Sequence, residues 1–186
     1  MNVIEAIHAR RAVRSYSPRA VEEREISSLL GAAVQAPSAM NAQPWSFVVV
    51  QDRARLKRYS DRAKSLLLSS AGDGKTRRYE GMLRDENFNV FYDAGTLIVI
   101  CAKEGGPYVQ ADCWLAAQNL MLAACEAGLG TCCIGFAVPV LNTPEVKAEL
   151  GIPSDVGAIA PLIVGYAAGR VEGPVRAEPR ILSWIR

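Results

Sequence analysis

The chain has 186 residues, of which 50% are hydrophobic and 22% are charged, an ordinary balance for a folded protein. This composition excludes disorder over most of the length, and the length predicts a single domain over residues 1–186. The formal net charge of +2 is too small to indicate a nucleic-acid-binding protein, which usually carries a strongly basic surface.

The sequence predicts a cytoplasmic protein that neither enters nor spans a membrane. Its first residues lack the apolar core of a secretory signal, and no apolar run reaches the length of a transmembrane helix. The five cysteines lie mostly in apolar segments, which favours buried reduced thiols. Cys132 and Cys133 are adjacent rather than spaced as Cys-x-x-Cys, so we expect neither a metal site nor a redox pair. The only histidine, His8, has no nucleophile motif nearby, so the sequence does not indicate a histidine-dependent hydrolase.

The N-terminal half is expected to form three helices and one strand. Apolar periodicity and capping residues predict helices over residues 2–10, 21–35 and 52–68. A run rich in β-branched and aromatic residues predicts a strand over 45–51. Residues 69–92 are turn-like and densely charged, so we expect a solvated, lid-like excursion there.

The C-terminal half is expected to mix strands and helices without regular alternation. Buried strands are predicted over 96–101, 131–136 and 158–166, and helices over 111–127 and 143–151. The helix over 111–127 is apolar nearly all round, which is typical of a central helix. A loose arm over 167–179 precedes a strand-like piece over 180–185, so the tail is expected to reach a second subunit.

Three arginines near the start of the chain predict a site for a bound anion. Arg10, Arg11 and Arg14 fall within five residues. Guanidinium groups are always charged and can bind phosphate through two parallel hydrogen bonds, which favours a phosphate-bearing cofactor. The alternative is that Arg10 and Arg11 complement the negative C-terminal end of the first helix.

Two further segments offer polar or open backbone for a ligand. Pro37, Ser38 and Asn41 place a turn, a hydroxyl and an amide in the connection before the first strand, where a plain turn is the alternative. Gly135 follows a buried strand and would let a flat ligand approach the backbone, unless it only marks a β-bulge.

Together these stretches resemble the FMN-dependent nitroreductase family. The resemblance is carried, in the family's order, by residues 10–16, 36–45, 112–136 and 165–166, followed by Arg176 and Trp184. It implies an α+β fold in which helices flank a central, mostly antiparallel sheet. It also implies a homodimer with FMN at the subunit interface and exchanged C-terminal tails.

The resemblance implies which residues bind FMN. Arg10, Arg11 and Arg176 would hold the phosphate, and Arg14 would lie near the pyrimidine edge of the flavin. Ala12 occupies a cofactor-binding position where a serine is common, so one hydroxyl contact would be lost.

The same resemblance places further residues around the flavin ring. The expected set is Pro37, Ser38 and Asn41 from the other subunit, Cys133, Ile134 and Gly135 against the ring, and an amide at Asn87 or Asn89.

The resemblance implies an oxidoreductase in which the flavin carries the chemistry and no side chain is catalytic. Hydride would pass from NADH or NADPH to flavin N5, and then to a small acceptor such as a nitroaromatic, a quinone or an enone. Two alternatives remain: a dehalogenating or flavin-fragmenting enzyme, whose acceptor pocket residues 69–92 would form, or a flavin-binding sensor or carrier without turnover.

Overall fold

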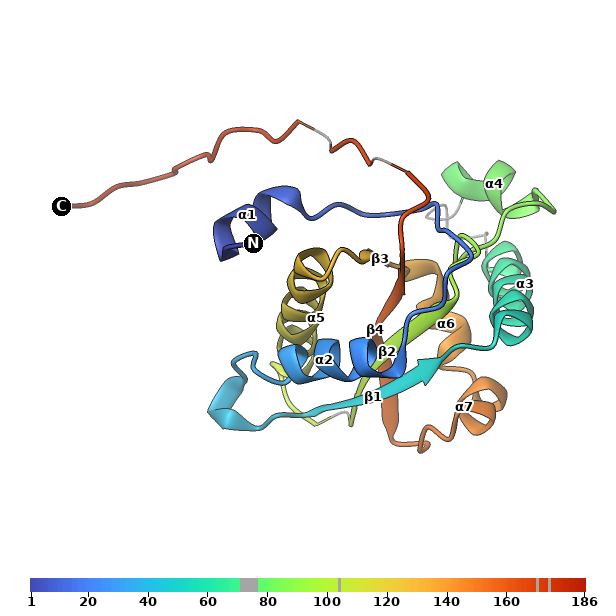
Figure 1. Ribbon diagram of the computed structural model, residues 1–186. Helices are drawn as coiled ribbons and strands as arrows, with labels where there is room; N and C mark the ends of the chain where they lie inside the picture. Colours follow the sequence, from blue (N-terminus) through green and yellow to red (C-terminus); the bar gives the residue numbers. More distant parts are fainter. Residues whose placement is uncertain (71–76, 104, 170, 174) are drawn as a thin grey trace.

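A four-stranded sheet forms the centre of the computed structural model (Figure 1), which describes residues 1–70, 77–103, 105–169, 171–173 and 175–186. The strand order is β1-β2-β4-β3, and all three pairings are antiparallel. The strands are β1 (Trp45–Val50), β2 (Thr96–Lys103), β3 (Gly130–Cys133) and β4 (Val156–Gly165). The antiparallel sheet and its flanking helices confirm the predicted α+β fold.

Helices cover both faces of this sheet (Figure 1). The α-helices are α1 (Val3–Ala9), α2 (Glu23–Ala33), α3 (Arg53–Ser69), α4 (Glu80–Arg84), α5 (Val109–Glu126), α6 (Val138–Leu141) and α7 (Pro144–Leu150). Short 3-10 turns lie at η1 (Ala39–Asn41), η3 (Arg77–Tyr79) and η4 (Gly135–Ala137). Among the residues with described structure, no helix is both long and apolar enough to cross a membrane.

The two faces of β2 show why the sheet lies between two layers of helices. Leu97, Val99 and Cys101 belong to the core beneath α3, α6 and α7, while Ile98 and Ile100 belong to the core beneath α2 and α5. Successive side chains of a strand point to opposite faces, so a continuous apolar run fills both cores. This is why residues 96–101 could be predicted as a buried strand.

Residues 12–17 add an extended segment to the sheet at β3 and β4. Ala12 forms an isolated bridge with Thr131, and Tyr16 forms one with Ala167. The amide of Val13 donates to the Thr131 carbonyl at 2.9 Å. The stretch that carries Arg14 is therefore held by backbone hydrogen bonds.

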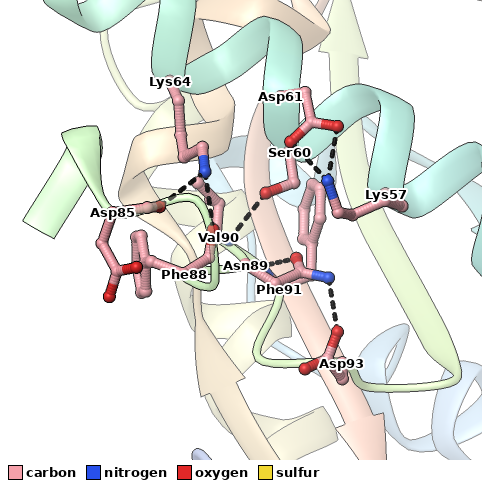
Figure 2. Close-up of polar contacts among 10 residues, drawn as sticks. All are labelled: Lys57, Ser60, Asp61, Lys64, Asp85, Phe88, Asn89, Val90, Phe91 and Asp93. Atoms are coloured by element: carbon pink, nitrogen blue, oxygen red, sulfur yellow. Dashed lines mark hydrogen bonds and ion pairs between the residues drawn. The ribbon is translucent and has the colours of Figure 1, made fainter.

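The expected excursion over residues 69–92 is more ordered in its second half than the sequence suggests. Residues 71–76 lie outside the described residues, but 77–84 form η3 and α4, and both Val90 and Phe91 are buried. Figure 2 shows the hydrogen bonds between α3 and the loop that follows α4. Lys64 Nζ donates to the carbonyls of Asp85, at 2.9 Å, and Phe88, at 3.0 Å. The Val90 amide donates to Ser60 Oγ on the same helix at 2.8 Å. The dense charge of the segment concealed the apolar residues that anchor it.

Three other expectations need correction. The strand predicted over 131–136 ends at Cys133, because Gly135–Ala137 turns into η4. The helix α5 is not covered all round, since Trp114 and Leu115 are exposed. No strand forms over residues 175–186 of the described tail, which runs away from the sheet in Figure 1. A strand there would need a neighbour that this single chain does not supply.

Candidate functional site

A cavity of about 630 Å³ lies beside the carboxyl end of β3, in the size range of small-molecule sites. It is lined by Arg14, Arg78, Tyr79, Met82, Val90, Tyr92, Cys132, Cys133, Ile134, Gly135 and Phe136. None of these residues is acidic, so the cavity is positively charged and otherwise aromatic or apolar. This lining suits a ligand that is flat and negatively charged.

The extended segment at β3 places Arg14 in this cavity. Val13 is buried against Gly130, and the following side chain, Arg14, lies on the opposite side of the extended backbone. The Arg14 guanidinium carbon lies 5.9 Å from the centroid of the Tyr92 ring. Backbone pairing with Thr131 thus sets the direction of a charged side chain.

Aromatic rings form the wall that faces this segment. The rings of Tyr79 and Phe136 meet edge to face, with centroids 5.0 Å apart and an interplanar angle of 77°. Phe88 and Tyr92 form a second such pair at 5.7 Å. Gly135 leaves open space, since no atom lies within 4 Å of the position that its Cβ would occupy. A planar ring system could therefore lie against the backbone at this point.

A smaller recess of about 240 Å³ shares the same segment and the other end of β3. Arg10, Arg11, Gly130 and Thr131 are among its lining residues. The Arg11 side chain donates to the carbonyls of His8 and Arg10, which is compatible with the role at the end of α1, and its contact with phosphate stays a prediction. Among the described residues, no carboxylate lies within 4.0 Å of Arg10 or Arg11.

Burial disfavours the negatively charged forms of the neighbouring thiol and phenol. It raises the pKa of the Cys132 thiol, and the nearby guanidinium groups of Arg14 and Arg10 only partly oppose this effect. Burial also raises the pKa of Tyr16, whose hydroxyl donates to the Val13 carbonyl at 2.7 Å. Cys132 and Tyr16 therefore do not neutralise the positive charge of Arg10 and Arg14.

Comparison with known proteins identifies this arrangement. The model of the nitroreductase family matches residues 7–166. The chain belongs to the nitroreductase family. It is 32% identical over 173 residues to a protein of Methanothermobacter thermautotrophicus named "Putative NADH dehydrogenase/NAD(P)H nitroreductase", covering 90% of this chain and 78% of that one. It is 27% identical over 164 residues to the iodotyrosine deiodinase of Thermotoga neapolitana, covering 84% of each.

A solved structure extends this likeness to the whole fold. The nitroreductase of Bacteroides fragilis with bound FMN has a TM-score of 0.87 and 25% sequence identity, covering 100% of both chains. The family that the sequence resembled is thus confirmed.

Not all of the predicted site residues of this nitroreductase-family chain come together. Arg14, Cys133, Ile134 and Gly135 line the cavity, and Arg10 and Arg11 line the recess. Ala12 lies between them and pairs with Thr131. Arg176 lies in the exposed tail, where its predicted contact with phosphate stays a prediction.

The loop around η1 lies on the other side of the molecule from α4 (Figure 1). Pro37, Ser38 and Asn41 do not line the cavity or the recess, as expected if they serve the other subunit of a dimer, which stays a prediction. The loop is held in an unusual conformation, with positive φ angles of 52° at Met40, 55° at Asn41 and 45° at Gln43. Such conformations persist where the surroundings fix them, and they are common at ligand sites.

Asn89 is occupied within its own turn. Its side-chain amide donates to Asp93 Oδ1 at 2.7 Å, and its oxygen accepts from the Phe91 amide at 2.9 Å (Figure 2). Asn89 and Asn87 are both absent from the cavity lining. A flavin contact for either amide stays a prediction.

The sequence points to residues 69–92 for an acceptor pocket, but it does not single out the wall residues Tyr79, Met82, Tyr92 and Phe136. Residues 79–92 and 132–136 are far apart in the sequence, and only the fold brings them together. The one local signal was aromatic residues within a charged segment, which do not fit a wholly solvated loop.

Proposed function

We propose that this protein transfers electrons from NADH or NADPH, through bound FMN, to a small planar acceptor such as a nitroaromatic, a quinone or an enone. The observation that carries this proposal is a cavity without acidic residues, in which Arg14 and the backbone of residues 133–135 face aromatic rings. FMN, when bound, accepts two electrons from the nicotinamide and supplies them to the acceptor. With a nitro acceptor, two electrons and two protons yield a nitroso group and one water for each NAD(P)H oxidised.

The residues of this chain would bind and orient the cofactor. Arg10 and Arg11, lining one recess, would hold the phosphate, together with Arg176 from the tail. Arg14 would place positive charge beside the flavin, where it favours the negatively charged reduced form. The open space at Gly135 would let the ring lie close to the backbone.

A homodimer is part of this proposal. Exposed apolar side chains cluster on α1, on α5 and in the tail: Val3, Ile4, Ile7, Trp114, Leu115, Leu182, Trp184 and Ile185. Large exposed apolar surfaces usually mark interaction sites. A second copy that covers them would explain why the apolar helix α5 has an open face, and would supply a neighbour for the tail.

A second candidate is reductive removal of a halide from an aromatic ring. It is supported by the 27% identity to the deiodinase of Thermotoga neapolitana. In this reaction hydrogen replaces the halogen, a halide ion leaves, and one NAD(P)H is oxidised. The acceptor would enter the same cavity.

Anaerobic mixing of the FMN-loaded protein with NADH or NADPH tests the proposal. The flavin absorbance at about 450 nm should fall rapidly and return when a nitroaromatic, quinone or enone is added. Recovery only with a halophenol would favour dehalogenation. A flavin that stays oxidised with both nicotinamides would contradict an oxidoreductase and favour a sensor or carrier.

A further inference from the structure

Resting on the proposed function, we propose that Arg78 makes the cavity selective for aromatic acceptors that carry a negatively charged substituent. The cavity contains two guanidinium groups, from Arg14 on the extended segment at β3 and from Arg78 on η3. In the proposed site Arg14 would lie beside the flavin, which leaves Arg78 available to an acceptor.

The position of Arg78 suits a carboxylate attached to an aromatic ring. Its guanidinium carbon lies 4.6 Å from the centroid of the Tyr79 ring, within the range of a cation–π contact. The Tyr79 ring in turn meets Phe136 edge to face. A planar acceptor against this wall would bring its substituent within reach of a planar donor group that pairs well with carboxylates.

The next two carboxylates after Arg78 in the sequence are held by other groups. Glu80 Oε1 accepts from Arg84 Nη2 at 2.8 Å and from Nε at 3.0 Å on the same helix. Asp85 Oδ1 accepts from the Asn87 amide at 2.9 Å. Within the described part of the chain, no carboxylate lies within 4.0 Å of Arg78. Its donors are therefore not neutralised by an ion pair there.

The phosphate of FMN has a different set of candidate partners. The proposed phosphate residues Arg10 and Arg11 line the recess, whose lining does not include Arg78. Arg78 shares the cavity instead with Met82 and Phe136, which offer apolar surface. The acceptor class that fits is an aromatic ring with a carboxylate or sulfonate.

Two acceptors of nearly equal shape test this selectivity: 4-nitrobenzoate, which is an anion, and 4-nitrobenzamide, which is neutral. We compare kcat/KM for the pair in the FMN-loaded wild type, in Arg78→Gln and in Arg78→Lys. Arg77→Gln is the matched control, because Arg77 is exposed, adjacent and absent from the cavity lining. Both glutamine variants remove one positive charge, so any general effect of net charge is common to them.

The wild type should prefer the anion, and Arg78→Gln should reduce the ratio of the two kcat/KM values by about fivefold, the upper end for an exposed charge pair. The change should appear in KM for 4-nitrobenzoate, and Arg78→Lys should retain part of the preference. Arg77→Gln should leave the ratio within about twofold of wild type.

Three results would overturn the inference. Equal ratios in Arg78→Gln and Arg77→Gln would show that only net charge matters. Loss of FMN from Arg78→Gln alone would assign this arginine to the cofactor, and a lower preference for NADPH over NADH with an unchanged acceptor ratio would assign it to the nicotinamide. If the wild type reduced neither acceptor nor any quinone, the proposed function itself would fail, which is a separate outcome.

Discussion

Val13 lies so close to Gly130 that a Cβ atom on this glycine would be 2.5 Å from Val13 Cγ2. This contact seats the extended segment on β3 and thereby fixes Arg14, the next residue, in the cavity. A small residue in one strand thus determines where a charge from a distant part of the chain is placed.

Replacing Gly130 with alanine should disturb both stability and cofactor binding. The added methyl group must displace Val13 or the backbone, which should lower the free energy of unfolding by about 1–3 kcal/mol. Urea unfolding and FMN titration measure the two effects. Gly31→Ala on α2 is the control, because no atom lies within 4 Å of its Cβ position, and it should keep or slightly raise stability. A Gly130→Ala protein with wild-type stability and FMN affinity would show that the contact is unimportant.

Arg10→Ala and Arg176→Ala should each weaken FMN binding. Loss of one charge-assisted contact with phosphate costs about 1.5–3 kcal/mol, so the dissociation constant should rise by at least about tenfold. Quenching of FMN fluorescence measures it. Arg24→Ala is the control, since Arg24 pairs with Glu22 at 2.8 Å and lines neither the cavity nor the recess. Wild-type affinity in both test variants would remove the phosphate assignment.

Asp112 should stabilise the conformation of the loop around η1. It is 4% exposed, and its Oδ1 accepts from the Ala39 amide at 3.1 Å. Asp112→Ala would leave that amide without this partner, at a cost of about 1–3 kcal/mol, and should speed hydrogen exchange in residues 38–43. Asp112→Asn keeps an acceptor oxygen and should be milder. Identical exchange in wild type and both variants would mean that the loop is held in another way.

The contact between α7 and α3 should make stability depend on pH. The hydrogen bond from Arg62 holds the pKa of Glu149 below its ordinary value of 4.5, and a hydrogen bond from Tyr59 acts in the same direction. A carboxyl with a lowered folded-state pKa stabilises the fold above its unfolded pKa, and this contribution is lost as the pH falls through the folded pKa.

Glu149→Gln should therefore be less stable than wild type at neutral pH, and the difference should shrink as the pH falls below about 4.5. Urea unfolding at a series of pH values measures the difference, and Glu145→Gln on the same helix is the control. A stability difference that stays constant with pH would show that the substitution acts through the shape of the side chain and not through its charge.

The helices and strands could largely be predicted because local signals define them. Asn2 caps α1, Asp52 caps α3 and Thr143 caps α7, each accepting a backbone hydrogen bond as its sequence context suggests. The apolar run of β2 is a similarly local signal. The predicted helices over 2–10 and 52–68 thus agree with α1 and α3 to within one or two residues.

The parts that could not be predicted depend on long-range contacts. Whether Arg11 faces a ligand or the end of α1 depends on where the chain runs after His8, and the structure has it donating to carbonyls of that turn. The burial of Val90 depends on Ser60, which lies 30 residues away. In the proposed homodimer the positions of Ser38 and Arg176 relative to the cavity would depend on a second chain, so neither sequence pattern nor a single chain decides them.

Sedimentation velocity of the FMN-reconstituted protein, recorded at about 450 nm where only flavin absorbs, tests the central claim most directly. We predict that the flavin colour sediments with a species of about twice the 20.1 kDa chain mass. Removal of residues 175–186 should release both the colour and the partner. A colourless protein after reconstitution, or colour carried by a single chain, would contradict a flavin site completed by two copies.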